Sequence, residues 1–368
     1  MSLKKMIAGY VIPKVVKRNL RLQRKTMALA AGGIGLLLAG REVMRRINEY
    51  DLRGKTVLVT GGSRGLGLVL ARECVLQGAR VAICARDQQE LEQARQDLLE
   101  RGGKVIAIPC DLTSQAEVER MVQSVQSQFG KIDVLINNAG IITVAPAEEM
   151  TISDYEEAMK VNFWASLYTA NAVLPAMRDR RQGRIVNIAS IGSKISVPHL
   201  LPYSASKFAL YGWSLGLRSE LAKDDIIVTT ICPGLMRTGS PRNATFKGQH
   251  RAEYAWFSVA DSLPFVAMGA ERAARQILTA CKRGEAEAVL SLPAKVAATL
   301  NSLFPNITAD FLGIVTRLLP GPGGIGTQGV RGEDSESALS PSILTTMGDK
   351  AAVRNNEFAA SAMAGAKT

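Results

Sequence analysis

Short apolar runs and longer amphipathic stretches alternate through the middle of the chain. Seven runs are rich in Val, Ile, Leu and Ala, and most end near Gly, Asn or Asp. Such near-continuous runs are typical of strands covered on both faces, and the stretches between them, such as 87–101 and 114–129, have helical spacing. The predicted strands are Thr56–Thr60, Arg80–Cys84, Lys104–Cys110, Val134–Asn137, Arg184–Ala189, Ile226–Cys232 and Ala286–Ser291.

Strand–helix alternation at this rhythm predicts βαβ units and a parallel sheet with helices on both faces. The expected fold class is α/β, a doubly wound, Rossmann-like sheet of about seven strands in a single domain over residues 51–320. Residues 1–50 form an N-terminal extension. Residues 321–368 are rich in Gly, Ser, Ala and Thr with few large apolar residues, so we expect a flexible C-terminal tail.

The positive charge of the chain is concentrated in the N-terminal extension. The formal net charge is +12, but residues 1–50 hold eleven Lys and Arg against two Glu, which leaves only +3 for the remaining residues. A basic body would suggest nucleic acid as a partner. Because the body is nearly neutral, no nucleic-acid partner is expected.

An uncharged run over residues 26–40 follows the basic stretch. Fifteen residues of helix reach about 22 Å, short of the ~30 Å hydrocarbon core of a bilayer. A secretory signal peptide is a second interpretation, but the basic stretch is long and no clear cleavage site follows. With its heavier positive flank in the cytoplasm, a membrane-spanning segment would place the α/β domain on the opposite side of the membrane. We therefore favour a surface anchor formed by residues 1–45 over a membrane span or a plain soluble extension.

The five cysteines, Cys74, Cys84, Cys110, Cys232 and Cys281, are odd in number and contain no CxxC pair. They are expected to be small buried residues in a reducing compartment. The chain has only two histidines, and its cysteines and histidines do not cluster in the sequence, so we expect no metal site.

A glycine-rich turn follows the first predicted strand. The sequence Thr60-Gly-Gly-Ser-Arg-Gly-Leu-Gly67 has the spacing TGxxxGxG and leads into a helix that ends near Leu76. Glycines at these positions let the backbone turn tightly and approach a pyrophosphate at the helix N-terminus. Its place between the first strand and helix favours a dinucleotide site over an ordinary turn.

Two arginines suggest which dinucleotide binds. Arg64 lies within the turn, and Arg86 follows the second strand, where an acidic residue would bind the ribose hydroxyls of NAD. Arginines there suit a 2′-phosphate. Asp87 lies beside them, so a helix N-terminal carboxylate next to a solvated arginine is the alternative. NADP(H) is expected, with NAD(H) second.

Tyr203 and Lys207 are four residues apart and share one face of a predicted helix. An unperturbed phenol titrates near ~10 and is a poor base at neutral pH. We expect the nearby ammonium to lower the pKa of Tyr203, so that it can act as a general acid and base. Taken alone, the pair is usually a packed Tyr beside a surface Lys.

Together these motifs resemble the short-chain dehydrogenase/reductase family, over roughly residues 52–293. The resemblance includes Asp111 after the third strand, Asn137-Asn-Ala-Gly140 after the fourth, and Asn162, Ser190 and Tyr203-Ser-Ala-Ser-Lys207. Pro233-Gly-Leu-Met-Arg-Thr238 follows the sixth strand. Their order and spacing are similar to those of the family.

The resemblance implies an NADP(H)-dependent oxidoreductase that interconverts a ketone or aldehyde with an alcohol. Tyr203 would transfer the proton, Ser190 would bind the substrate oxygen, Lys207 would hold the nicotinamide ribose, and Asn162 would support a water relay. Ser193 is the other candidate for the serine role, but its spacing from Tyr203 fits less well than that of Ser190. We expect His199 to be a partly exposed polar residue and not a catalytic one. The implied cofactor residues are Gly61, Ser63, Arg64, Gly65, Leu66, Gly67, Arg86, Asp111, Leu112, Asn138, Ala139, Gly140, Tyr203, Lys207, Pro233, Gly234 and Thr238.

Residues 236–265 lie where this family places its substrate-covering loop. They include the aromatic residues Phe246, Tyr254, Trp256 and Phe257, which suit a lipophilic substrate or simply pack the loop or a partner subunit. By resemblance, the helix over residues 203–223 would mediate a dimer or tetramer. The expected location is cytoplasmic, at the inner face of the cytoplasmic membrane. The alternatives are a nucleotide-sugar epimerase or dehydratase, and a catalytically silent nucleotide-binding scaffold or redox sensor.

Overall fold

The computed structural model describes residue 40, residues 49–342 and residues 345–358. The residues from Asp51 onward form one compact unit, and this unit carries all that follows. The predicted anchor over residues 1–45, with its uncharged run over residues 26–40, lies outside the described residues except for residue 40. Among the residues that are described, no helix is both long enough and apolar enough to cross a membrane.

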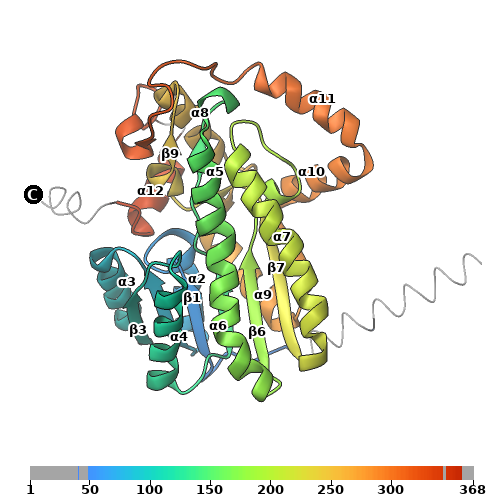
Figure 1. Cartoon of the computed structure of the whole chain (residues 1–368). Helices are drawn as coiled ribbons and strands as arrows, with labels where there is room; N and C mark the ends of the chain where they lie inside the picture. Colours follow the sequence, from blue (N-terminus) through green and yellow to red (C-terminus); the bar gives the residue numbers. More distant parts are fainter. Residues whose placement is uncertain (1–39, 41–48, 343–344, 359–368) are drawn as a thin grey trace, which may run out of the picture. The chain divides into compact units, whose positions relative to one another are not determined.

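A seven-stranded sheet, parallel throughout, forms the centre of this unit (Figure 1). The strand order is β3-β2-β1-β4-β6-β7-β11. From β1 the chain adds strands first toward one edge of the sheet and then, starting with β4, toward the other edge, which confirms the doubly wound fold. All seven predicted strands are present, to within one residue at each end. They are β1 (Thr56–Thr60), β2 (Arg80–Ala85), β3 (Lys104–Pro109), β4 (Val134–Asn137), β6 (Gly183–Ile188), β7 (Ile226–Pro233) and β11 (Glu287–Leu290).

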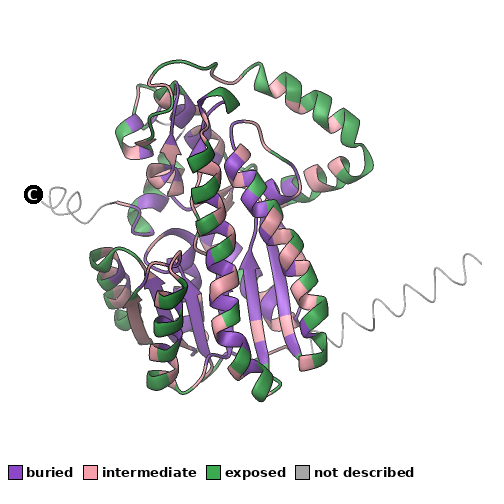
Figure 2. Cartoon of the chain, in the orientation of Figure 1, coloured by how far each residue is buried: buried purple, intermediate pink, exposed green. Residues whose placement is uncertain are grey.

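Helices cover both faces of the sheet, which explains why its strands are apolar on both sides (Figure 2). On one face α4 (Gln115–Phe129), α6 (Ala165–Asp179) and α7 (Leu201–Leu221) bury a core that includes Leu58 and Val173. Helices α2 (Gly65–Leu76), α3 (Gln88–Glu100) and α9 (Ala270–Arg283) belong to the other layer, where α2 contacts both α3 and α9.

Residues 236–265, expected as a loop, contain a helix and short strands. Helix α8 (His250–Ser262) is flanked by β8 (Met236–Arg237), which pairs with β10 (Met268–Gly269), and by β9 (Thr245–Phe246), which pairs with β5 (Thr143–Val144). We call residues 236–265 the lid. Two further helices, α10 (Leu292–Leu303) and α11 (Pro305–Thr316), follow one another and contact each other near the turn that joins them, and we call them the α10–α11 hairpin (Figure 1).

The expectation of a flexible tail over residues 321–368 is wrong for the part that the structure describes. Strand β12 (Val330–Arg331) pairs with β9, and α12 (Thr346–Arg354) contacts α8 and β8. Ala351 and Ala352 are buried. Their small side chains let α12 lie close against the backbone at Gly239. The tail therefore packs although it has few large apolar residues, which was the reason for expecting it to be flexible.

The cysteines agree with the sequence analysis, since all five are buried and free. Burial raises the pKa of the Cys232 thiol, which lies in the strand next to the site, to about 11. No group of three or more His, Cys, Asp or Glu that could hold a metal ion occurs within residues 49–342 or 345–358.

Candidate active site

The glycine-rich turn joins β1 to α2 at the point where the strand order reverses. Gly61 and Gly65 have φ of +63° and +55°, a conformation that favours glycine. Gly67 has no room for a side chain, because its Cβ would lie 2.0 Å from the Gly61 carbonyl oxygen. Leu66 and Ser63 are buried on either side of Gly65. The turn therefore has the tight geometry that close approach to a pyrophosphate requires.

The Asn137–Gly140 segment, after β4, is tied to this turn by hydrogen bonds. The Oγ1 of Thr60 accepts from the backbone N–H groups of Asn138 and Ala139, at 2.9 and 3.1 Å. The side-chain amide of Asn138 donates to the carbonyl oxygens of Thr60 and Gly61. A Cβ on Gly61 would lie 2.9 Å from the Ala139 Cα. The two loops thus hold each other at the switch point of the sheet, where ligands of such folds bind.

The two arginines differ in their surroundings. Arg64 Nη1 donates to Glu90 Oε1 at 2.8 Å, whereas Arg86 is exposed and forms no hydrogen bond or ion pair with any described residue. Asp87 does not bind either arginine. Its Oδ1 accepts from the backbone N–H of Glu90 at 2.8 Å, because Asp87 is the N-cap of α3.

The remaining predicted cofactor residues lie at the ends of β3 and β7. Asp111 Oδ1 accepts from the backbone N–H and the hydroxyl of Thr113, and Leu112 is buried beside it. Pro233 is the last residue of β7, Gly234 follows it, and Thr238 is buried after β8. The structure places these residues at the carboxyl ends of the strands, as expected of a doubly wound fold.

Ser190, Tyr203 and Lys207 meet where β6 ends and α7 begins. Ser190 Oγ accepts from the Gly192 N–H at 3.0 Å, and a hydrogen bond between Ser190 and Tyr203 joins the two hydroxyls. Lys207 is buried, and its Nζ donates to the Ile188 carbonyl oxygen at 2.9 Å. The Lys207 Nζ lies 5.7 Å from the centre of the Tyr203 ring.

Asn162 lies in a π-helical turn, Lys160–Trp164, between α5 (Ile152–Met159) and α6. Such turns are rare and often occur at functional sites. The Asn162 side chain accepts from the Ile141 N–H at 2.8 Å and donates to the Ile141 carbonyl and to Ser206 Oγ. A Cβ on Gly140 would lie 2.9 Å from Asn162 Oδ1 and 3.4 Å from Lys207 Nζ. Asn162 and Lys207 therefore approach the same glycine.

The expected direction of the Tyr203 pKa shift is wrong for the chain alone. Burial raises the pKa of Tyr203, and the hydrogen bond from Ser190 opposes this rise only in part. Burial also lowers the pKa of Lys207 to about 8. The physical reason is that the surrounding protein disfavours the charged form of both groups.

The two other polar residues of this region have structural partners. Ser193 Oγ donates to the Ser190 carbonyl oxygen and lies 3.7 Å from Cys232 Sγ. His199 is buried, contrary to the expectation of a partly exposed residue. Its Nδ1 lies 2.8 Å from Glu253 Oε1 on α8. This contact links the loop before α7 to the lid.

The lid aromatics pack mainly on each other. Phe246, Tyr254 and Phe257 are buried in one cluster, with ring centroids 5.3 and 6.0 Å from Phe246 to the other two. Tyr203 packs against this cluster. Of the two interpretations of the lid aromatics, the structure favours internal packing for these three residues. The lid thereby covers the side of the site where Tyr203 lies.

The sequence analysis missed one group of contacts at the glycine-rich turn. The Gly65 N–H donates to the Asn355 carbonyl oxygen at 2.8 Å, and Asn356 and Glu357 follow along the same surface. Nothing in the sequence pattern indicated that residues so far along the chain reach this turn.

Comparison with known proteins gives a consistent assignment. The family model described as short chain dehydrogenase matches residues 55–247. A dehydrogenase/reductase SDR family protein 7-like of Anopheles gambiae is 37% identical over 281 residues, which cover 74% of this chain and 87% of that protein. The ketoacyl reductase HetN of Nostoc sp. is 39% identical, over 50% of this chain and 64% of its own length.

Solved structures agree with the sequence comparisons. A short-chain dehydrogenase from Streptomyces avermitilis has a TM-score of 0.61 at 28% identity, covering 72% of this chain and 97% of that one. With the seven-stranded sheet and the matching family model, the chain belongs to the short-chain dehydrogenase/reductase family, and it is therefore an oxidoreductase that uses a nicotinamide cofactor.

Proposed function

We propose that this chain is an NADP(H)-dependent oxidoreductase that interconverts a ketone or aldehyde with an alcohol on a lipophilic substrate. The observation that carries the proposal is the meeting of Ser190, Tyr203 and Lys207 beside the glycine-rich turn. A bound nicotinamide supplies or accepts the hydride at the substrate carbon. The protein supplies the proton at the substrate oxygen and the groups that orient it.

The proton step falls to Tyr203. Its neutral phenol donates a proton to the carbonyl oxygen in the reducing direction, and Ser190 hydrogen-bonds the same oxygen. Lys207 holds the nicotinamide ribose, and its positive charge stabilises the phenolate left behind. Asn162 keeps the π-helical turn in place beside Lys207 and supports the proton relay.

The preference for NADP(H) rests on Arg86 and Asp87. Arg86 is exposed at the end of β2 with no ion pair among the described residues, so its guanidinium is available to a 2′-phosphate. Asp87, the carboxylate that would otherwise bind ribose hydroxyls, already caps α3. Arg64 would be a second phosphate ligand, after its hydrogen bond to Glu90 is replaced by one to the 2′-phosphate.

The lipophilic substrate is supported by the α10–α11 hairpin. Apolar side chains are exposed at helical spacing along both helices. The hairpin borders the site, because Asn301 of α10 donates to the Lys194 carbonyl at 2.9 Å, just after Ser190 and Ser193. The exposed apolar residues are Leu292, Val296, Leu300, Leu303, Phe304, Ile307, Phe311, Ile314 and Leu318.

Two curated relatives indicate a substrate class. The ketoacyl reductase HetN of Nostoc sp. and a putative ketoacyl reductase of Streptomyces coelicolor are 39% and 38% identical to this chain. We therefore favour a keto group on an acyl chain. The hairpin, together with residues 1–45, would hold the protein on the cytoplasmic face of a membrane. A homodimer would form in part through two exposed aromatic residues, Trp164 in the turn before α6 and Phe208 in α7.

A panel of ketones tests the proposal. The purified full chain is mixed with NADPH and with a long-chain 3-ketoacyl thioester, a steroid ketone, a retinoid aldehyde or a short water-soluble ketone, and NADPH oxidation is followed. Faster turnover of the lipophilic substrates is expected. Cofactor binding without turnover across the panel would favour the silent scaffold instead.

A further inference from the structure

Three consecutive C-terminal residues contact the glycine-rich turn, which lies almost three hundred positions earlier in the chain. The Asn355 carbonyl accepts from the Gly65 N–H at 2.8 Å. The Asn356 side chain donates to the Ser63 carbonyl at 3.0 Å. Glu357 forms an ion pair with Arg64, at 3.6 Å between Oε2 and Nε. Residues 63–65 are thus each held by one residue of this segment.

The Glu357 carboxylate lies at the anion-binding end of α2. A Cβ on Gly65 would come within 2.4 Å of Glu357 Oε1, and Glu357 is buried. The first turn of a helix has unpaired N–H groups and a positive dipole end, which attract phosphates and carboxylates alike. The Glu357 side chain in this position occupies space that a pyrophosphate would need.

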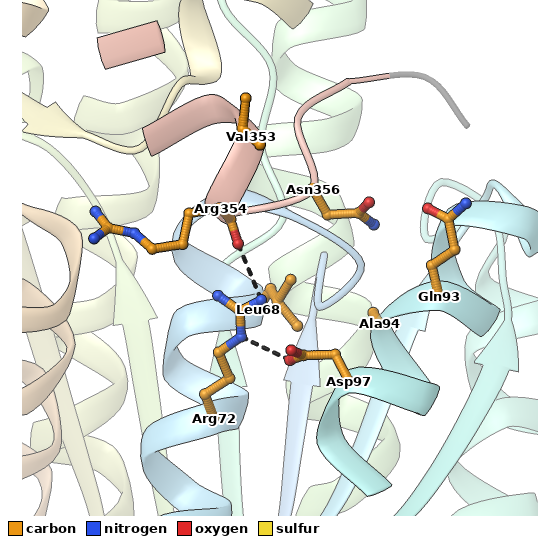
Figure 3. A pocket seen from close by; sticks show the side chains of 8 residues that line it. All are labelled: Leu68, Arg72, Gln93, Ala94, Asp97, Val353, Arg354 and Asn356. Carbon is orange, nitrogen blue, oxygen red and sulfur yellow. Dashed lines mark hydrogen bonds and ion pairs between the residues drawn. The ribbon is translucent and has the colours of Figure 1, made fainter. Parts of the chain in front are cut away.

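Further contacts fix the segment from both sides. Arg72 of α2 donates to the Arg354 carbonyl at 3.0 Å and forms an ion pair with Asp97 of α3 (Figure 3). The Asn355 side chain donates to the Thr238 carbonyl at 3.1 Å. Thr238 is one of the residues expected to cover the nicotinamide end of the cofactor. The segment therefore lies against both the pyrophosphate-binding turn and the nicotinamide end of the expected cofactor groove.

The segment is anchored by contacts that can be broken without opening the main core. Asn355 and Glu357 are buried polar residues, and the preceding helix α12 buries only the small side chains Ala351 and Ala352. Glu357 accepts hydrogen bonds from the side-chain amide of Asn243, and water can also satisfy these groups. Segments with few apolar contacts are those that open most readily in a native protein.

We propose that Asn355–Glu357 is a built-in competitor of the cofactor. While docked, the segment holds the anion-binding turn of α2, and the dinucleotide binds when the segment leaves. The apparent cofactor affinity is then reduced by the fraction of molecules in which the segment is docked. This inference rests on the proposed function only in taking the turn as the dinucleotide site. It holds for either nicotinamide cofactor.

Equilibrium titration with NADPH, and in parallel with NADH, tests the competition in the full chain. Asn356→Ala removes the hydrogen bonds to Ser63 and Glu90 and also disfavours the φ of +58° at this position. A chain that ends at Ser342 lacks the whole segment. The controls are Asn306→Ala on the exposed surface of α11 and a chain that ends at Phe358, which keeps every contact described above.

Asn356→Ala is expected to lower the dissociation constant of the cofactor about five- to tenfold, since two hydrogen bonds of the docked state are lost. The chain ending at Ser342 should bind at least as tightly, and both controls should match the full chain. Unchanged or weaker binding in both test variants would overturn the competition. If NADH is the tighter ligand but responds to the variants in the same way, the competition stands and the proposed NADP(H) preference fails.

Discussion

The Lys207 Nζ lies 5.7 Å from the centre of the Tyr203 ring, one turn away on α7, and donates to the Ile188 carbonyl rather than to the phenol. The two side chains therefore share a helix face, as their spacing predicts. Burial dominates both groups, since it raises the pKa of Tyr203 and lowers the pKa of Lys207 to about 8. This arrangement is the basis of the proposed proton transfer from Tyr203.

Replacing Lys207 should separate activity from stability. Its buried ammonium has a pKa lowered to about 8, against 10.5 in the unfolded chain, so the native state binds fewer protons between these values. The cost of burying the charge is full below pH 8 and disappears as the pH rises toward 10.5. Lys207→Met should abolish turnover and raise the free energy of unfolding at pH 7, by on the order of 1–3 kcal/mol.

Chemical denaturation of Lys207→Met and wild type at pH 7 and pH 10 checks this expectation. The stability advantage of the variant should shrink at the higher pH. A variant less stable than wild type at pH 7 would show that the hydrogen bond to Ile188 outweighs the burial of the charge.

Cofactor choice should depend on Arg86 more than on Arg64. Arg86 is free of ion pairs with the described residues, whereas Arg64 must first leave Glu90. Arg86→Ala should raise the KM for NADPH about 10- to 100-fold, as expected for the loss of a charged hydrogen bond to phosphate, and should leave the KM for NADH nearly unchanged. Steady-state kinetics with both cofactors measure this, and an equal effect on NADPH and NADH would refute the phosphate role.

Membrane attachment should depend on the hairpin as well as on residues 1–45. Leu303, Phe304 and Ile307 are between 50% and 67% exposed. Replacing all three with serine should weaken binding to vesicles of anionic and neutral phospholipid about tenfold or more, because their apolar area no longer enters the lipid. Vesicle flotation gives the bound fraction. Leu76→Ser, at a 67% exposed residue of α2, is the matched control, and equal flotation of the triple variant would contradict the hairpin's role.

Docking of the C-terminal segment should weaken as the pH rises. Burial raises the pKa of Glu357 to about 7, opposed by Arg64, Asn243 and Arg242, and reinforced by Glu90. The docked state then binds more protons than the undocked one, so docking is favoured below pH 4.5 and is progressively lost up to about pH 7. The ratio of NADPH dissociation constants, full chain over the chain ending at Ser342, should fall at least about fivefold from pH 5.5 to pH 7.5.

The ratio cancels the titration of the cofactor itself, which is common to both chains. Glu357→Gln should remove most of the pH dependence. A ratio that stays constant over this range would show that Glu357 does not control docking.

The strands and the main site were predictable because each depends on a local pattern. Strands covered on both faces must be apolar, so Val134–Asn137 and Ile226–Pro233 stand out in the sequence. The side chains after them, such as Asn138 and Ser190, reach the same edge of the sheet because its strands are parallel.

The C-terminal contacts were not predictable in this way. Ala352 packs because Gly239 offers a surface without a side chain, and Asn355 is buried through hydrogen bonds rather than apolar area. Neither leaves a periodic pattern in the sequence. The pKa of Tyr203 was misjudged for a related reason, since spacing brings Lys207 close but does not reveal how deeply both groups are buried.

The most direct test of the central claim is NADPH oxidation by Tyr203→Phe beside the wild-type chain, with the ketone of the panel that the wild type reduces fastest. The phenylalanine keeps the ring and its contacts with the lid but has no proton to give. Turnover should fall by roughly 10²- to 10⁴-fold, while the dissociation constant of NADPH stays within about twofold. Turnover that survives the substitution would contradict the assignment of Tyr203 as the general acid and base.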